Sequence, residues 1–79
     1  MSKKEKLRRK IIDSDSEISF EDLITFLCQN GFQMRQRGSH CIFTLNDILD
    51  QLNVQPTSQG KVRRYQIKQV RDFFQRNRL

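Results

Sequence analysis

The hydrophobic pattern of this chain changes from a helical to a strand period at Asn30-Gly31, and this change constrains the fold more than any other feature. From Phe32 onward, apolar and polar residues alternate, as they do in a half-buried strand. Asn-Gly supplies the left-handed residue that commonly ends a helix. Before it, apolar residues recur at helical spacing and form one core-facing stripe: Phe20, Leu23, Ile24 and Leu27. The sequence therefore predicts a helix followed by antiparallel strands.

Signals for the start of this helix lie at Ile18-Ser19. Ser19 is placed to cap the helix, an acidic residue occupies the third helical position, and Ile18 and Leu23 are spaced for a hydrophobic staple. Further upstream, Ser2-Lys3-Lys4-Glu5 fits a capping box and predicts a short basic helix that runs to about Ile12. Its apolar edge would consist of Leu7, Ile11 and Ile12. The polar, acidic stretch that follows predicts a linker, so we divide the chain into a leader, 1–17, and a folded domain, 18–79.

A hairpin turned at Arg37-Gly38 fits the alternation after Phe32. Counting outward from that turn places His40 opposite Arg35 on a polar, outward face. The other face is apolar and is expected to be buried, with the pairs Met34–Cys41 and Phe32–Phe43. A four-residue loop would keep the same parity, so the prediction that His40 faces outward does not depend on the turn.

The remaining elements are a turn, a third strand and a last helix. Residues 46–50 predict a turn or a single helical turn. Leu52-Asn53-Val54-Gln55 predicts a short strand that Pro56 ends, with Leu52 and Val54 inward and Gln55 outward. A helix is expected from about Tyr65 to Asn77, with Ile67, Val70, Phe73 and Phe74 on its apolar face. The predicted class is α+β: helix, three-stranded antiparallel sheet, helix, and an extra short N-terminal helix.

The charge of the chain indicates its class of partner. Its 79 residues suit one small domain, which buries only about 60% of the surface exposed in the unfolded chain and leaves no room for a large substrate cavity. Fifteen Lys and Arg against nine Asp and Glu give a net charge of +6, and the pI is near 9.9. Such a domain attracts polyanions, and RNA or DNA is the leading partner.

Membrane partners and export fit the sequence less well. The basic residues are not confined to one amphipathic helix, and no apolar run approaches the roughly 20 residues that span a bilayer. The basic N-terminus leads into Ile11-Ile12 and an acidic stretch rather than into the apolar region of a signal peptide. We therefore expect a cytoplasmic protein without a membrane partner.

Two cysteines, Cys28 and Cys41, are too few for a disulfide framework. Both are predicted to be buried thiols, Cys28 on the apolar side of a helix and Cys41 in a strand. One His and two Cys would need an outside ligand to complete a tetrahedral zinc site, so we expect no structural metal and no cofactor. A catalytic Cys41 beside His40 is disfavoured because adjacent strand residues point to opposite faces.

The chemistry-bearing stretch is Arg35-Gln36-Arg37-Gly38-Ser39-His40, which contains the only histidine of the chain. Imidazole has an ordinary pKa of roughly 6.5 and can take and return protons near neutral pH, while arginines beside it can hold a phosphate. This pattern favours an RNA-cutting site, with His40 catalytic and Arg35, Arg37, Gly38 and Ser39 binding RNA. The alternative is that His40 is a surface or packing residue of a half-exposed strand.

A second basic cluster, Lys61-Val62-Arg63-Arg64, precedes the last helix. Free backbone N–H groups and the helix dipole add to these side-chain charges, so an anion would be favoured there. Without an anion or a partner carboxylate, basic residues at a helix start are electrostatically unfavourable. We therefore predict that Lys61, Arg63 and Arg64, together with Lys68 in the helix, contact RNA phosphates.

The order of elements resembles the double-stranded RNA-binding domain, and the motifs resemble a narrower family, the HicA-type mRNA interferases. The resemblance covers residues 20–79, and the leader at 2–12 resembles the extended N-terminus of one subgroup. The stretches that carry it are Gly31-Phe32, Arg35 to His40, Ile42-Phe43, Leu52-Asn53-Val54-Gln55 and Tyr65-Gln66-Ile67-Lys68-Gln69-Val70. The catalytic histidine of the family falls on His40, whereas a second histidine found in many relatives is replaced here by Cys41.

This resemblance implies the toxin of a toxin–antitoxin pair, an endoribonuclease that cuts mRNA and is neutralised by a HicB-type antitoxin. The sequence places no metal-ligand cluster and no pair of carboxylates near His40, which favours a route that uses the ribose 2′-hydroxyl of the RNA itself. Two alternatives remain open. One is a non-catalytic RNA-binding module, and the other is a small adaptor whose basic face binds an acidic protein.

Overall fold

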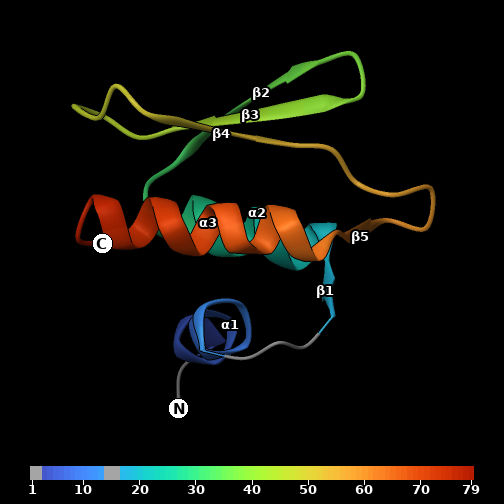
Figure 1. Cartoon of the computed structure of the whole chain (residues 1–79), viewed down its shortest axis with the longest axis horizontal. Helices are drawn as coiled ribbons and strands as arrows, with labels where there is room; N and C mark the ends of the chain where they lie inside the picture. The colour runs from blue at the N-terminus through green and yellow to red at the C-terminus, as the bar shows by residue number, and fades with distance from the viewer. Residues whose placement is uncertain (1–2, 14–16) are drawn as a thin grey trace.

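Three helices and a three-stranded antiparallel sheet form an α+β fold in the computed structural model, which describes residues 3–13 and 17–79. The elements in chain order are α1 (Lys3–Ile12), β1 (Ile18–Ser19), α2 (Phe20–Gln29), β2 (Gln33–Arg37), β3 (His40–Thr44), β4 (Gln51–Val54), β5 (Lys61–Val62) and α3 (Arg64–Arg76). The predicted class and the order of the main elements are confirmed. Figure 1 shows three layers: the sheet β2-β3-β4, the pair α2 and α3, and α1.

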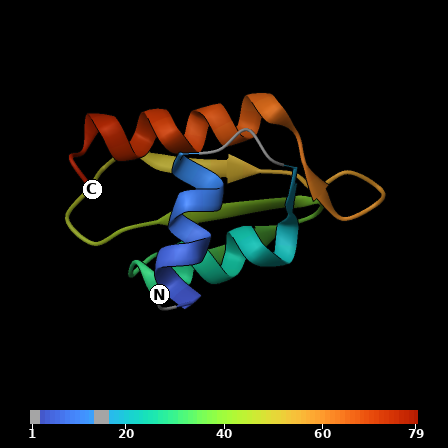
Figure 2. The ribbon, with the colours of Figure 1, turned by 90° about the horizontal axis from the view of Figure 1, so that it is seen from below.

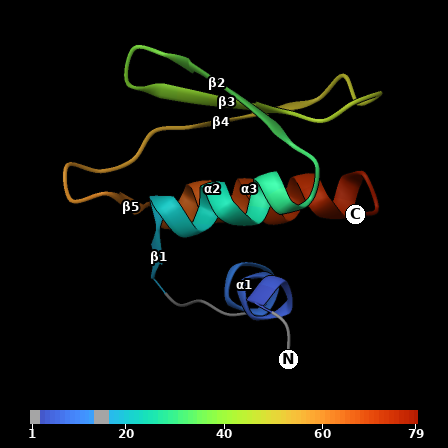
Figure 3. The same ribbon diagram turned by 180° about the vertical axis from the view of Figure 1, so that it is seen from behind.

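Helices α2 and α3 form the middle layer and bury the core against one face of the sheet (Figures 1 and 3). Phenylalanine rings join the two helices to the chain entering β2. The ring centroids of Phe26 and Phe74 are 5.3 Å apart, and those of Phe32 and Phe73 are 5.5 Å apart. Such ring pairs stabilise a core beyond the area that they bury. Phe26 is fully buried although the predicted apolar stripe of α2 did not include it.

The ends of α2 follow from its sequence. Ser19 adopts an extended conformation and its hydroxyl accepts a hydrogen bond from the backbone N–H of Asp22 at 3.1 Å, as the capping signal predicts. At the other end Asn30 is the C-cap, and Gly31 takes a φ of 91°, which side chains with a Cβ rarely adopt. The chain then turns directly into β2.

Helix α1 crosses both α2 and α3 on the side away from the sheet, as Figure 2 shows from below. Its Leu7 and Ile11 are buried, so the basic leader belongs to the same core as the rest of the domain. Arg71 of α3 donates from Nε to the carbonyl of Ile11 at 2.8 Å. The predicted cap at Ser2 and part of the predicted linker, residues 14–16, lie outside the described residues.

The pairing of β2 with β3 differs from the predicted register by two residues. His40 pairs with Arg37 and Ile42 pairs with Arg35, so the turn lies at Gly38-Ser39 rather than at Arg37-Gly38. The reason is conformational: the first central residue of a tight hairpin turn takes a positive φ, and Gly38, at 58°, adopts it more readily than an arginine would. Because the shift keeps the parity, Arg35 and His40 still share one face, and Arg37, which was predicted to lie in the turn, joins them there.

Strand β2 is the exposed edge of the sheet, and all five of its residues are exposed. Met34 was predicted to be buried opposite Cys41, but it pairs with Phe43 and is 44% exposed. Phe43 is fully buried in the central strand. The apolar face of the sheet is therefore covered along β3 and β4 and left open along β2.

A two-stranded ladder, which was not predicted, pairs the segment just before α2 with the segment just before α3. Ile18 pairs with Val62 and Ser19 pairs with Lys61, and both Ile18 and Val62 are buried. The predicted staple residue Ile18 is thus a strand residue that fills the core. This ladder holds the basic segment at Lys61 beside the start of α2 and leads straight into α3.

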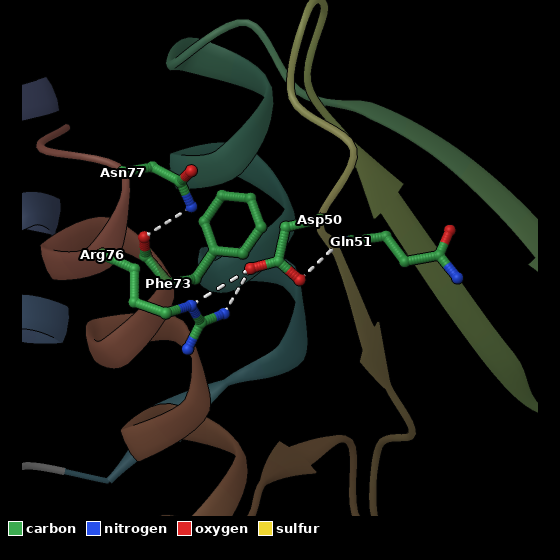
Figure 4. A network of polar contacts seen from close by, with 5 residues as sticks. All are labelled: Asp50, Gln51, Phe73, Arg76 and Asn77. Atoms are coloured by element: carbon green, nitrogen blue, oxygen red, sulfur yellow. Dashed lines mark hydrogen bonds and ion pairs between the residues drawn. The ribbon is translucent and has the colours of Figure 1, made fainter.

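Strand β4 is attached to α3 at both of its ends. Near its start, Arg76 donates from both Nε, at 3.2 Å, and Nη2 to the Oδ2 of Asp50, whose other oxygen accepts from the Gln51 backbone (Figure 4). Near its end, the buried Gln66 contacts the backbone of Gln55. Its amide, oriented to donate to the Gln55 carbonyl and accept from the Gln55 N–H, makes both contacts at 3.0 Å. These links fix the position of β4 relative to the helices.

No helix within residues 3–13 and 17–79 is long and apolar enough to cross a membrane.

Candidate nucleic-acid interface and catalytic site

The outer face of the sheet, which no helix covers, holds the predicted catalytic residue (Figure 1). We call it the outer face and define it by three cross-strand rows. The rows are Gln33–Thr44–Gln51, Arg35–Ile42–Asn53 and Arg37–His40, with Gln55 just beyond the end of β4. All are exposed except Ile42, which is half-buried. The face is thus cationic and rich in amides, and it contains no carboxylate.

His40 is exposed and starts the central strand β3. Its Nδ1 lies 3.1 Å from the Oδ1 of Asn53, which projects from the same face of β4. Arg37 is its cross-strand neighbour, and Cβ atoms in such pairs are about 4.5–5.5 Å apart. One exposed imidazole therefore contacts a neutral amide and has an arginine as its cross-strand partner, an arrangement that can support general acid–base chemistry at a phosphate.

Two glutamine side chains are hydrogen-bonded to the hairpin turn beside His40. Gln36 donates from its side chain to the carbonyl of Gly38 at 3.2 Å, and Gln55 donates to the hydroxyl of Ser39 at 3.3 Å. The second contact reaches from β4 across the end of β3 to the turn. The structure therefore brings the predicted residues Gly38 and Ser39 next to His40 and limits their movement.

A shallow groove of about 360 Å³ runs along the outer face and the edge of β2. Arg35 and Arg37 line it together with Gln33, Met34, Ile42, Thr44 and Gln51. His40 follows Arg37 across the strands, so it stands at the end of this groove near the hairpin turn. A groove with two guanidinium groups and several amides suits a phosphate backbone and its ribose hydroxyls, both of which are rich in hydrogen-bond acceptors.

The second predicted cluster lies apart from the outer face. Lys61 is on β5, Arg63 is the N-cap of α3 without a side-chain hydrogen bond to the helix, and Arg64 begins α3. These three line a groove of about 400 Å³ with Glu17, Val62, Ile67 and residues 57–59. Lys68 is exposed four residues after Arg64 and so shares its side of α3. The hairpin turn and this cluster lie at the same end of the domain, but on different layers (Figures 1 and 3).

Most of the net charge lies on a third surface. Helix α1 carries six Lys and Arg against one Glu, which accounts for five of the six net positive charges. Lys3, Lys4, Lys6 and Arg9 are exposed on it. Because α1 lies on the side of the helix layer opposite the sheet, these charges are on a different side of the molecule from the outer face (Figure 1).

The two cysteines occupy different environments. Cys41 is buried, as predicted, on the inner face of β3 and points away from His40. Cys28 is exposed, contrary to the prediction, because Phe26 and Leu27 supply the buried side of α2 at this position. Within residues 3–13 and 17–79, no three His, Cys, Asp or Glu side chains gather as a metal site would require.

Three amides of this site were not assigned a role from the sequence: Asn53, Gln55 and Gln66. Asn53 and Gln55 alternate with the inward residues Leu52 and Val54, so the strand pattern itself predicts that both point outward. Their closeness to His40 and Ser39 could not, because it depends on the β3–β4 register. The buried Gln66 gave no sequence signal.

Searches of this chain against protein-family models, curated proteins and solved structures found no significant match.

Proposed function

We propose that this chain is a metal-independent endoribonuclease that cuts mRNA, with His40 as the residue that moves the proton. The observation that carries the proposal is an exposed imidazole, hydrogen-bonded by Asn53 and paired with Arg37, on an uncovered cationic sheet face. A histidine that serves only packing would lie against the core. The element order further supports a double-stranded RNA-binding-domain-like fold.

The proposed reaction uses the RNA as its own nucleophile. His40 takes the proton of a ribose 2′-hydroxyl, the 2′-oxygen forms a bond to the adjacent phosphorus, and the bond from phosphorus to the 5′-oxygen breaks. The leaving oxygen takes a proton from water, and His40 returns its proton to solvent. Arg37 and Arg35 stabilise the negative charge that builds up on the phosphoryl oxygens. The products are a 2′,3′-cyclic phosphate and a 5′-hydroxyl.

The residues at the end of the domain extend the contact with RNA. Gly38 and Ser39 border the reacting phosphate, while Lys61, Arg63, Arg64 and Lys68 hold phosphates further along the strand. This second contact also suits a non-catalytic RNA-binding module, which is the alternative function. A third candidate function is a small basic adaptor for an acidic protein. An adaptor would bind such a protein tightly and would bind no RNA even at low salt.

We further propose that the chain is a HicA-type toxin of a toxin–antitoxin pair in the cytoplasm, and that a HicB-type antitoxin covers the outer face. The charge of this face, with Arg35 and Arg37 and no carboxylate, suits an inhibitor that places acidic groups over it. Such an inhibitor competes directly with RNA. Addition of the antitoxin should therefore raise the RNA concentration needed for half-maximal cleavage.

The decisive experiment incubates the purified chain and its His40→Ala variant with an end-labelled transcript in the presence of a chelator. We expect the wild type to cut and the variant to bind RNA but cut about 10²- to 10⁴-fold more slowly, the usual contribution of general acid–base help. The ends should be cyclic phosphates and 5′-hydroxyls. Undiminished cutting by His40→Ala, 5′-phosphate ends, or loss of cutting in chelator would each overturn the mechanism. Salt-sensitive RNA binding without any new ends would select the binding module.

A further inference from the structure

We propose that Asn53 is a positioning residue for His40: it holds the proton on Nδ1 and leaves Nε2 as the basic nitrogen that faces the RNA. This inference rests on the proposed function, because it assigns the reacting atom of the same histidine. It starts from one contact, the 3.1 Å between His40 Nδ1 and Asn53 Oδ1.

The direction of this hydrogen bond follows from its chemistry. An amide oxygen only accepts, so the imidazole nitrogen that faces it must donate and must carry a hydrogen. In a neutral ring the other nitrogen then has a lone pair and no hydrogen. For His40 that nitrogen is Nε2, at the far end of an exposed side chain. An unconstrained neutral imidazole favours the opposite tautomer, so Asn53 selects the less common form.

The strand register explains why Asn53 can do this. Asn53 lies directly opposite Ile42 in the β3–β4 pairing, and Ile42 and His40 are two residues apart on the same face of β3. His40 and Asn53 are therefore diagonal neighbours across the two strands. The Cα atoms of such neighbours are about 7–8 Å apart, a distance that the side chains of a histidine and an asparagine can bridge. The hydrogen bond between His40 and Asn53 therefore depends on the register of β4 relative to β3.

The links from β4 to α3 supply that constraint. Gln55 lies two residues after Asn53, and its backbone N–H and carbonyl are both hydrogen-bonded to the side chain of Gln66. The Gln55 side chain in turn donates to the hydroxyl of Ser39. Asp50, three residues before Asn53, is bonded to Arg76. A ring oriented by a strand that is fixed at both ends loses little freedom when it reacts, which is the benefit of a preorganised site.

The choice of an amide rather than a carboxylate has its own consequence. A carboxylate at this position would orient the ring equally well but would also stabilise its protonated form. The neutral Asn53 orients the ring without placing a negative charge beside it.

The test measures the tautomer and the kinetics in the full chain. Long-range ¹H–¹⁵N spectra of the His40 ring above its titration range should show a protonated Nδ1 in the wild type and in Gln75→Ala, a control that removes an exposed amide from α3. In Asn53→Ala the proton should move largely to Nε2. A wild-type ring with the proton on Nε2, or an unchanged tautomer in Asn53→Ala, would overturn the inference.

Cleavage kinetics then separate positioning from structure. Asn53→Ala should lower kcat with little change in KM; orienting partners of metal-bound histidines contribute about 10- to 100-fold, and we expect the same order here. Asn53→Asp should keep the Nδ1 proton and shift the acidic limb of the kcat–pH profile to higher pH. An unchanged kcat in Asn53→Ala would overturn the inference even if His40→Ala is inactive. If instead His40→Ala cuts normally, the proposed function fails whatever the tautomer.

Discussion

Arg37 and His40 face each other across the hairpin, as the last residue of β2 and the first residue of β3. Arg35 lies one row further along and pairs with Ile42. Arg37 is therefore the cross-strand partner of His40, whereas the predicted register had placed Arg35 there. This relationship determines which arginine should matter for the chemical step.

We expect Arg37→Ala to lower kcat for RNA cleavage more than Arg35→Ala does. The loss should reach up to about 10²-fold, because a cation beside the reacting phosphate stabilises charge that develops only in the transition state. Arg35→Ala should mainly raise KM, because Arg35 lies in the next cross-strand row and would contact a phosphate that binds equally well in the ground state and the transition state. Steady-state cleavage of a labelled oligonucleotide measures both effects. Arg78→Gln, near the C-terminus, is the matched loss of an exposed arginine, and equal effects of all three variants on kcat would contradict the assignment.

Alternation in the sequence was sufficient to predict which residues share the outer face, but not which residues are neighbours on it. Parity survives a shift of two residues, so Arg35 and His40 stayed on one face although their partners changed, while Arg37 moved from the predicted turn into the strand. The register depended on whether Arg37 or Gly38 takes the positive φ of the turn, which is a local conformational preference rather than a hydrophobic pattern.

The contacts that were not predicted join segments far apart in the chain. Asn53 reaches His40 across a connection of six residues, 45–50, whose path sets the β3–β4 register. The β1–β5 ladder has two residues on each side, too few for any periodicity to register. Burial of Gln66 depends on how α3 docks on β4, and exposure of Cys28 depends on how α2 docks on the core. Local signals, such as the Ser19 cap, were by contrast predicted correctly.

Neutralising the exposed cations of α1 should slow RNA association at low salt without changing kcat. The variant replaces Lys3, Lys4, Lys6 and Arg9 by glutamine. These charges lie on the far side from His40, so their effect on RNA is long-range attraction, which is screened over about 10 Å at 0.1 M salt. Stopped-flow association rates measured from low to high salt should converge with those of the wild type. A fall in kcat at saturating RNA would contradict this separation of roles.

The ion pair between Asp50 and Arg76 should make stability depend on acid pH. Hydrogen bonding by Arg76, helped by its charge, lowers the pKa of Asp50 below the roughly 3.9 typical of aspartate. A lowered pKa in the folded state stabilises the fold above the unfolded pKa, and this contribution disappears as pH falls through the lowered value. Both side chains are partly exposed, at 40% for Asp50 and 57% for Arg76, so the effect should be small.

The measurement compares urea unfolding of the wild type and Asp50→Asn between pH 7 and pH 2. We expect the wild type to be more stable at neutral pH and the difference to shrink below about pH 4, where the unfolded carboxyl becomes protonated. Asp72→Asn is the control, since it removes an exposed carboxylate from α3, the helix that carries Arg76. A difference that stays constant over the whole range would show that the pair does not contribute through its charge.

Replacing Gln66 by leucine should destabilise the domain by about 1–3 kcal/mol, because the backbone N–H and carbonyl of Gln55 would both lose their partner, the buried amide of Gln66. Besides lowering the stability of the whole domain, the substitution should loosen the end of β4. The Gln55 amide proton should exchange faster with solvent than in the wild type, and the His40–Asn53 contact on the same strand should loosen with it. Urea unfolding and amide exchange together measure the two effects.

Gln69→Leu provides the control for this change, since it makes the same replacement at an exposed position of α3 and should alter stability by no more than about 0.5 kcal/mol. If Gln66→Leu were as stable as Gln69→Leu and the Gln55 amide stayed protected, the contact between Gln66 and the Gln55 backbone would be dispensable. The order of β4 would then have to come from the packing of Leu52 and Val54 alone. A Gln66→Leu chain that is destabilised and also cuts RNA more slowly would instead connect α3, through β4, to the orientation of the His40 ring.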